Sequence, residues 1–114
     1  HWSTDAYAAH HLQSLSLMPN VEIRVATVPD PKSWKQHVPF SRVIHSKYMV
    51  VDGKALWMGS ANWSGGYLDN SRNAELFIQD EDLAARVAKI HARLWNWEHT
   101  APIDPLKRYP KPRR

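Results

Sequence analysis

Several features that would narrow the function of a protein are missing from this sequence of 114 residues. It contains no cysteine, which excludes disulfides and thiolate chemistry and leaves the redox compartment undetermined. No apolar run approaches the roughly eighteen residues that a membrane span requires. The first residues do not resemble a signal peptide, and there is no initial methionine. We therefore expect a cleaved or partial chain. We leave its compartment open, while favouring a secreted, periplasmic or lumenal location.

Positive charge is concentrated at the end of the chain. The formal net charge is +4, yet five basic residues and no acid fall within the last eight positions, which leaves ten basic and eleven acidic residues elsewhere. The high isoelectric point therefore belongs to this segment rather than to a basic face of the fold. We assign residues 1–100 to one folded domain and 101–114 to a basic, proline-rich tail. The tail is interpreted as a solvated end or a strap on a partner, in preference to a nucleic-acid or membrane anchor.

Hydrophobic periodicity predicts an α/β domain in which a mixed β-sheet is flanked by helices. Helical spacing predicts one helix over residues 5–17 and another from residue 80 or 81, with an apolar stripe that reaches Trp97. Alternation predicts strands over 21–26, 43–51, 55–58 and 74–78, and Asp52-Gly53 is a two-residue hairpin signal. The stretch 28–40, with three prolines, predicts a surface loop, and 59–72 predicts a functional loop with a short helix.

The residues with the most specific chemical meaning are His45 and Lys47. Side chains two apart on a strand share a face, so an imidazole and an ammonium are expected to lie side by side. Phosphodiester cleavage needs this pairing. The ammonium neutralises non-bridging oxygens, while the imidazole attacks phosphorus or protonates the leaving oxygen. Ser60 and Asn62 follow the returning strand, and we predict that they donate hydrogen bonds to the same phosphate.

Other residues near this pair have supporting or structural interpretations. Glu75 opens the next strand, and we predict that it accepts a hydrogen bond from His45 Nδ1 and fixes the tautomer. Asp52 is expected to stabilise the hairpin rather than join the reaction. Trp57 and Trp63 bracket the loop, where they would stack a base, line a lipid cleft or serve packing alone. No histidine pair has zinc-motif spacing, so we expect no metal site. The remaining histidines are interpreted as structural: His1, His10, His11, His37, His91 and His99.

Together these residues resemble the signature of the phospholipase D superfamily, which is His-x-Lys, four residues, Asp, six residues and Gly-Ser-x-Asn. Here the pattern is formed by His45, Lys47, Asp52, Gly59, Ser60 and Asn62. Six residue types at set spacings make a chance match improbable. The stretches 38–50 and 62–67 are similar to the second motif of lysosomal phospholipase-D-like 5′-exonucleases and their poxvirus relatives. The resemblance extends over residues 21–97.

The resemblance implies an α-β-α sandwich and a two-step phosphodiesterase reaction without metal or other cofactor. One motif histidine forms a phosphohistidine intermediate, and the histidine of a second motif acts as acid and then as base. It implies that His45 is the acid and base, that Lys47 and Asn62 bind phosphate with help from Ser60, and that Glu75 orients the imidazole. Asp52 and Gly59 are then structural residues of the motif.

The sequence contains one such motif, which predicts the C-terminal half of a two-motif enzyme that is inactive alone. The expected partner is an N-terminal half that carries the other motif. One alternative is a homodimeric endonuclease in which a second copy supplies it, and another is a non-catalytic, membrane-associated member. The substrate is left open between a phospholipid and single-stranded nucleic acid.

Overall fold

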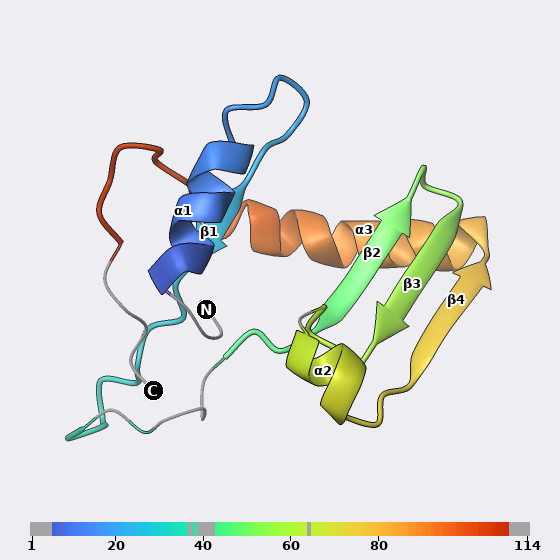
Figure 1. Ribbon diagram of the computed structural model, residues 1–114, viewed down its shortest axis with the longest axis horizontal. Helices are drawn as coiled ribbons and strands as arrows, with labels where there is room; N and C mark the ends of the chain where they lie inside the picture. Colours follow the sequence, from blue (N-terminus) through green and yellow to red (C-terminus); the bar gives the residue numbers. More distant parts are fainter. Residues whose placement is uncertain (1–5, 37, 39–42, 64, 110–114) are drawn as a thin grey trace. The chain divides into compact units, whose positions relative to one another are not determined.

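The computed structural model describes residues 6–36, 38, 43–63 and 65–109 (Figure 1). The predicted helix start at residue 5 and the last five residues of the predicted tail lie outside these ranges. Contacts divide the chain into two units. One is formed by His1–Ile44 together with Leu94–Arg114, and the other by His45–Arg93.

The first unit joins both ends of the chain through a two-stranded sheet. Helix α1 (Ala6–Leu15) precedes β1 (Arg24–Ala26), which pairs antiparallel with β5 (Thr100–Pro102). Ile103 extends the pairing, because its amide donates to the Ile23 carbonyl oxygen over 2.9 Å. The strand β5 was not predicted from the sequence, and its last two residues fall within the stretch interpreted as a tail.

The segment that follows β5 is held against α1 by one buried side chain. The Gln13 amide nitrogen donates to the carbonyl oxygens of Asp104 and Lys107, both over 2.8 Å. Buried polar groups are normally paired in this way, and here the pairing fixes a segment about ninety positions further along the chain. Residues 104–107 therefore lie on the folded unit to which α1 belongs.

The second unit contains a three-stranded antiparallel sheet with β3 in its centre. The strands are β2 (Lys47–Val51), β3 (Ala55–Gly59) and β4 (Glu75–Gln79). Directly paired residues project to one side, and residues two apart share a face. The register therefore forms two adjacent rows on one face: Lys47, Gly59 and Glu75 in the first, and Met49, Trp57 and Phe77 in the second.

A tight turn joins β2 to β3. The Lys54 amide donates to the Val51 carbonyl oxygen over 2.9 Å, and φ is positive at both central residues, 51° at Asp52 and 68° at Gly53. Positive φ at both positions defines a type I′ turn, whose twist matches that of the flanking strands. The predicted Asp-Gly hairpin is confirmed.

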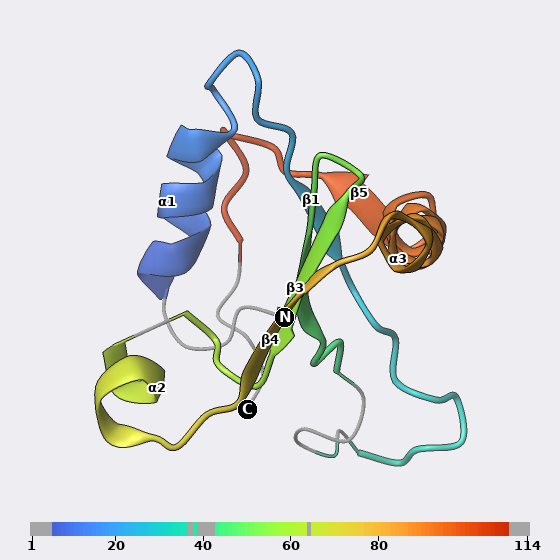
Figure 2. The ribbon, with the colours of Figure 1, turned by 90° about the vertical axis from the view of Figure 1, so that its right-hand side faces the viewer.

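Helices lie on both sides of this sheet (Figures 1 and 2). α3 (Glu81–Trp95) runs along one face, and α2 (Gly65–Asn70) lies on the other side. The Asp80 carboxylate caps α3 by accepting from the Leu83 amide over 2.8 Å. Leu56 of β3 and Ala84 of α3 are both fully buried. The expected α/β class, with sheets flanked by helices, is confirmed, and every described strand pair is antiparallel.

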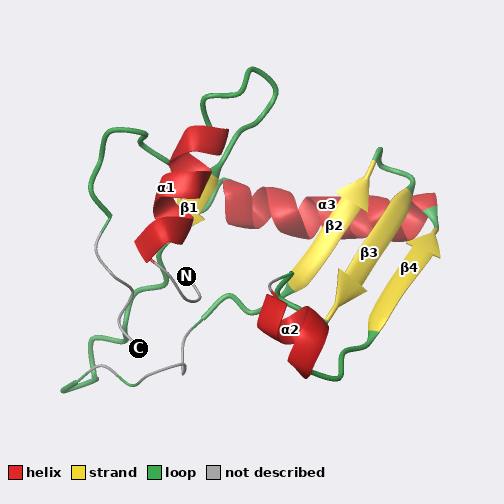
Figure 3. Ribbon diagram, viewed as in Figure 1, coloured by secondary structure: helices red, strands yellow, loops and turns green. Residues whose placement is uncertain are grey.

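Most predicted elements are present with shorter bounds. The described residues between β1 and β2 form no helix or strand, as expected for the loop (Figure 3). The predicted strand over 43–51 begins only at Lys47, because β3 ends at its partner Gly59 and offers residues 43–46 nothing to pair with. The predicted apolar stripe of α3 is interrupted, since Ile90 is 58% exposed. In the described part of the chain, no helix has the length and apolar content that crossing a membrane requires.

Candidate phosphate-binding site

The two central residues of the motif converge at the start of β2. Lys47 Nζ lies 3.0 Å from His45 Nε2 and donates to the His45 carbonyl oxygen over 2.8 Å. His45 precedes the strand and is exposed, whereas Lys47 is half-buried at its first position. An ammonium group has donors only, so a hydrogen bond between the two groups requires Nε2 to accept, which is the tautomer with its proton on Nδ1. The side-by-side arrangement expected from the spacing is present.

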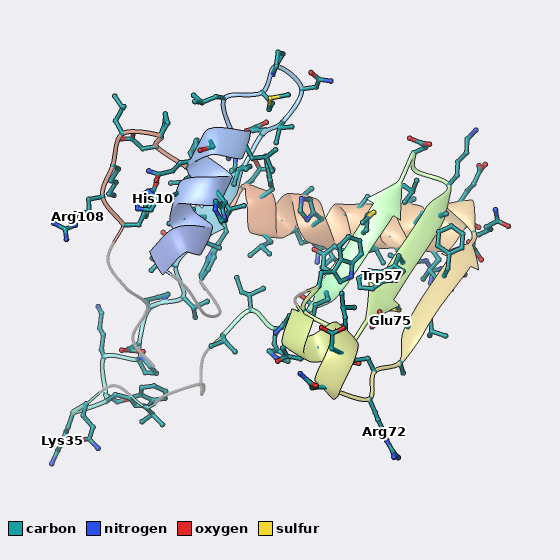
Figure 4. All side chains as sticks on the ribbon, in the orientation of Figure 1. His10, Lys35, Trp57, Arg72, Glu75 and Arg108 are labelled. Atoms are coloured by element: carbon teal, nitrogen blue, oxygen red, sulfur yellow. The ribbon has the colours of Figure 1, made fainter. Side chains whose placement is uncertain are left out.

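Gly59 is positioned between Lys47 and Glu75, and its lack of a side chain has a visible reason. A Cβ at Gly59 would overlap the Glu75 carboxylate. The carboxylate therefore extends across β3, where its Oε1 accepts from the amide of Ala61 over 3.2 Å. Figure 4 shows Glu75 and Trp57 on the face of the sheet turned away from α3. The predicted bond between Glu75 and His45 stays a prediction, since the bond that is present goes to the backbone.

Ser60 links the ends of two strands. Its hydroxyl donates to Asn73 Oδ1 over 3.1 Å and accepts from the Ala74 amide over 3.1 Å. The single hydroxyl proton is thus already donated to Asn73, and a phosphate oxygen can only accept. The predicted role of Ser60 in phosphate binding therefore requires that proton to turn away from Asn73. Asn62 is half-buried two residues later, and no hydrogen bond of its side chain is formed among the described residues.

Asp52 is separated from the other motif residues by the length of β2. It occupies the hairpin turn, five residues beyond Lys47, which corresponds to roughly 16 Å at the usual rise of a strand. Its carboxylate is therefore out of reach of a phosphate bound at Lys47. This placement agrees with the expectation that Asp52 stabilises the hairpin.

Two contacts around the site were missed by the reasoning from sequence. Asn73 was given no role, yet its amide donates to the Tyr67 carbonyl oxygen over 2.6 Å and so ties α2 to the segment that precedes β4. The available signal was an amide residue two positions before Glu75, the first residue of β4. His91, interpreted as structural, lies with Nδ1 3.2 Å from the Tyr48 hydroxyl and joins α3 to β2.

Burial affects the ionisation of Tyr48, the residue next to Lys47 on β2. Burial raises the pKa of the Tyr48 hydroxyl above its ordinary value of 10.0, because desolvation disfavours the phenolate. Tyr48 points to the α3 face, whereas its neighbour Lys47 points to the other. Within the described residues there is no cluster of three or more histidine and carboxylate groups that could hold a metal ion.

Comparison with known proteins agrees with the motif. A family model described as the PLD-like domain of cardiolipin synthase matches residues 1–95. The chain belongs to the phospholipase D superfamily. It is 35% identical over 104 residues to phospholipase D Z of Dictyostelium discoideum, covering 90% of this chain and 24% of that protein.

Nucleases are among the similar members of the superfamily as well. The virion nicking-joining enzyme of vaccinia virus (strain Western Reserve) is 34% identical over 95 residues, covering 78% of this chain and 22% of that protein. The 5′-3′ exonuclease PLD3 of Xenopus laevis is 30% identical over 94 residues, covering 76% and 19%. The chain thus spans about a quarter or less of the length of these relatives, and their names include both phospholipases and nucleases.

Proposed function

We propose that this chain supplies one of two histidine-containing halves of a phosphodiesterase active site. The observation that supports this proposal most directly is the convergence of His45 Nε2 and Lys47 Nζ within 3.0 Å at the end of a sheet. Membership of the superfamily supports it independently. The proposal makes His45 and Lys47 the chemical centre, with Asn62 and Ser60 at the phosphate.

The proposed reaction has two balanced steps. In the first, a ring nitrogen of the second motif's histidine attacks phosphorus, the bond from phosphorus to the leaving oxygen breaks, and protonated His45 gives its proton to that oxygen. In the second, neutral His45 accepts a proton from water, the water oxygen attacks phosphorus, and the N–P bond breaks. The phosphate monoester leaves, and both imidazoles return to their starting states. No metal ion takes part in either step.

The other residues of the site stabilise charge or position groups in this scheme. Lys47 turns its N–H bonds from His45 toward the non-bridging oxygens, where charge builds in the transition state. Asn62 donates from its amide to the same oxygens, and Ser60 assists. Glu75 has two tasks in the proposal: its Oε1 holds the Ala61 amide, and its carboxylate orients the Nδ1–H tautomer of His45.

The second motif is proposed to come from a separate or cleaved N-terminal half. The homodimeric endonuclease is the alternative in which a second copy supplies it, and a non-catalytic membrane-associated member is another. Native mass spectrometry of the assembled protein separates the first two. A complex with a larger companion chain supports the proposal, whereas a stable pair of identical chains favours the homodimer.

The test of the catalytic assignment replaces two exposed histidines in the same way. His45→Asn in the assembly with its second half should lower hydrolysis of bis(p-nitrophenyl) phosphate by roughly a hundredfold or more, as expected for loss of an acid and base. His10→Asn, at an exposed position on α1, is the matched control and should retain activity. Both measurements are made with EDTA present. Turnover by His45→Asn equal to that of the control would end the assignment.

A further inference from the structure

The apolar row of the sheet lies directly beside the proposed phosphate site. Met49, Trp57 and Phe77 project from three paired strands on the same face as Lys47, Gly59 and Glu75. The two rows are one two-residue step apart, which is about 6.6 Å along a strand. Met49 is 40% exposed and Phe77 is 61% exposed. A substrate whose phosphate binds at Lys47 therefore has an accessible apolar surface next to it.

Trp63 extends this surface from the loop. It directly follows Asn62, its side chain is 58% exposed, and its ring centroid lies 4.9 Å from that of Trp57 at an interplanar angle of 72°. An edge-to-face contact leaves at least one face of the Trp63 ring uncovered by its neighbour. The half-buried Trp57 thus supports the Trp63 ring without covering it.

The backbone at Trp63 is held in an unfavourable conformation. Its φ is 51°, in the left-handed region, which is unfavourable for a bulky residue. Strain of this kind persists only where the surrounding structure maintains it, and it clusters at ligand sites. Here it places an exposed indole immediately beyond the residue proposed to bind phosphate.

We infer that Trp63, supported by Trp57, is the residue that stacks a nucleobase next to the scissile phosphate, so that the substrate is a single-stranded nucleic acid. The inference rests on the proposed phosphodiesterase function, to which it adds the substrate class. Aromatic rings stack on every base because every base has a π-face. Two of the three residues in the row are aromatic, which suits planar bases better than the aliphatic lining that an acyl chain requires.

Charge at the same end of the sheet agrees with a polymer that carries repeated phosphates. Arg72 lies three residues before Glu75, is exposed, and projects outward at the end of β4 where that strand begins (Figure 4). A simple phospholipid headgroup has a single phosphate, which Lys47 is proposed to bind, so it has no further phosphate for Arg72. A nucleic-acid strand offers further phosphates to a second cation.

The test measures binding by the 114-residue chain and needs no turnover. The probes are a short labelled strand of thymidines and a strand of equal length whose nucleotides lack bases, compared by fluorescence anisotropy. Trp63→Leu should reduce the preference for the base-containing strand roughly five- to a hundredfold, the range for loss of one stacked base. Trp63→Phe keeps a ring and should restore much of the preference.

Controls separate stacking from packing. Trp97→Leu removes a tryptophan of the first unit, whose ring contacts His99, and should leave the base preference unchanged. Near-ultraviolet circular dichroism and thermal unfolding establish that each variant is folded. An unchanged base preference in folded Trp63→Leu would overturn the inference, as would an original chain that binds both strands equally.

Two further outcomes distinguish the inference from the function on which it rests. If Trp63→Leu weakens sedimentation with phosphatidylglycerol vesicles but not binding of the thymidine strand, the surface serves lipid and the inference is wrong. If hydrolysis depends on His45 while base preference does not depend on Trp63, the proposed function stands and the inference alone fails. If base preference depends on Trp63 but the assembly does not hydrolyse phosphodiesters, the proposed function fails and the stacking of bases on Trp63 stands.

Discussion

Replacing Gly59 by alanine tests whether the Glu75 carboxylate occupies the space above β3. A Cβ at this position overlaps that carboxylate, and the overlapping atoms are the far end of a flexible side chain. The side chain can therefore rotate away, but it then loses its bond to the Ala61 amide. We expect Gly59→Ala to displace Glu75 rather than to unfold the sheet.

The magnitude follows from two opposing contributions. Losing a hydrogen bond to a charged group costs about 1.5–3 kcal/mol, and the lower end applies because Glu75 is exposed. Alanine gains about 0.5–1 kcal/mol over glycine inside a strand. The net loss in the free energy of unfolding should be about 0.5–1 kcal/mol. In a Glu75→Ala background the bond is already absent, so Gly59→Ala should be neutral or slightly stabilising there.

A double-mutant cycle by urea denaturation measures this coupling. The signal is near-ultraviolet circular dichroism, to which the Trp57–Trp63 pair in the same unit contributes. Gly53→Ala is the matched control: its φ is 68° and nothing lies within 4 Å of the added Cβ. Its cost of about 1 kcal/mol is local strain and should be equal in both backgrounds. Equal costs for Gly59→Ala in both backgrounds would refute the reasoning.

Two other changes give sharp expectations. Arg72→Gln should make the salt dependence of single-strand binding less steep, with the slope of log K against log salt changing by about 0.7. The control Arg86→Gln, on α3, should leave that slope unchanged. Identical slopes for the two variants would exclude Arg72 from phosphate contact. The raised pKa of Tyr48 means that the folded state holds its proton more tightly than the unfolded state, so this contribution to stability is complete below pH 10.0 and declines as pH rises above it. Denaturant titrations from pH 8 to pH 11 should therefore show a smaller alkaline loss for Tyr48→Phe than for the original chain; parallel losses would contradict the assignment.

Local signals in the sequence predicted the hairpin and the pair at its start. Asp52-Gly53 selects a type I′ turn by itself, since both positions adopt positive φ. The two-residue spacing of His45 and Lys47 was sufficient to bring them together, although His45 lies just outside the strand. These features depend on neighbours a few residues apart, which is the range over which sequence patterns are informative.

Features that depend on distant pairing were not predictable in the same way. Thr100–Pro102 has no strand pattern of its own, and it is a strand because β1 lies beside it. Position 59 holds a glycine because the Glu75 carboxylate, sixteen positions later in the chain, occupies the space of a Cβ there. The spacing of residues in the sequence cannot show this. Glu75 was correctly placed on the next strand, but its bond to the Ala61 backbone depends on how the loop after β3 folds back.

The register of the hairpin offers a physical reason for an aspartate so far from the candidate phosphate site. The turn at Asp52 and Gly53 pairs Val51 with Ala55, and this pairing in turn places Lys47 opposite Gly59. A slip of one residue would move Lys47 to the α3 face, because side chains alternate along a strand. Aspartate tolerates the positive φ that this turn demands better than most residues with a side chain do. We infer that Asp52 contributes to the proposed reaction by holding the register that aims Lys47 at the candidate site, and not by contact with substrate.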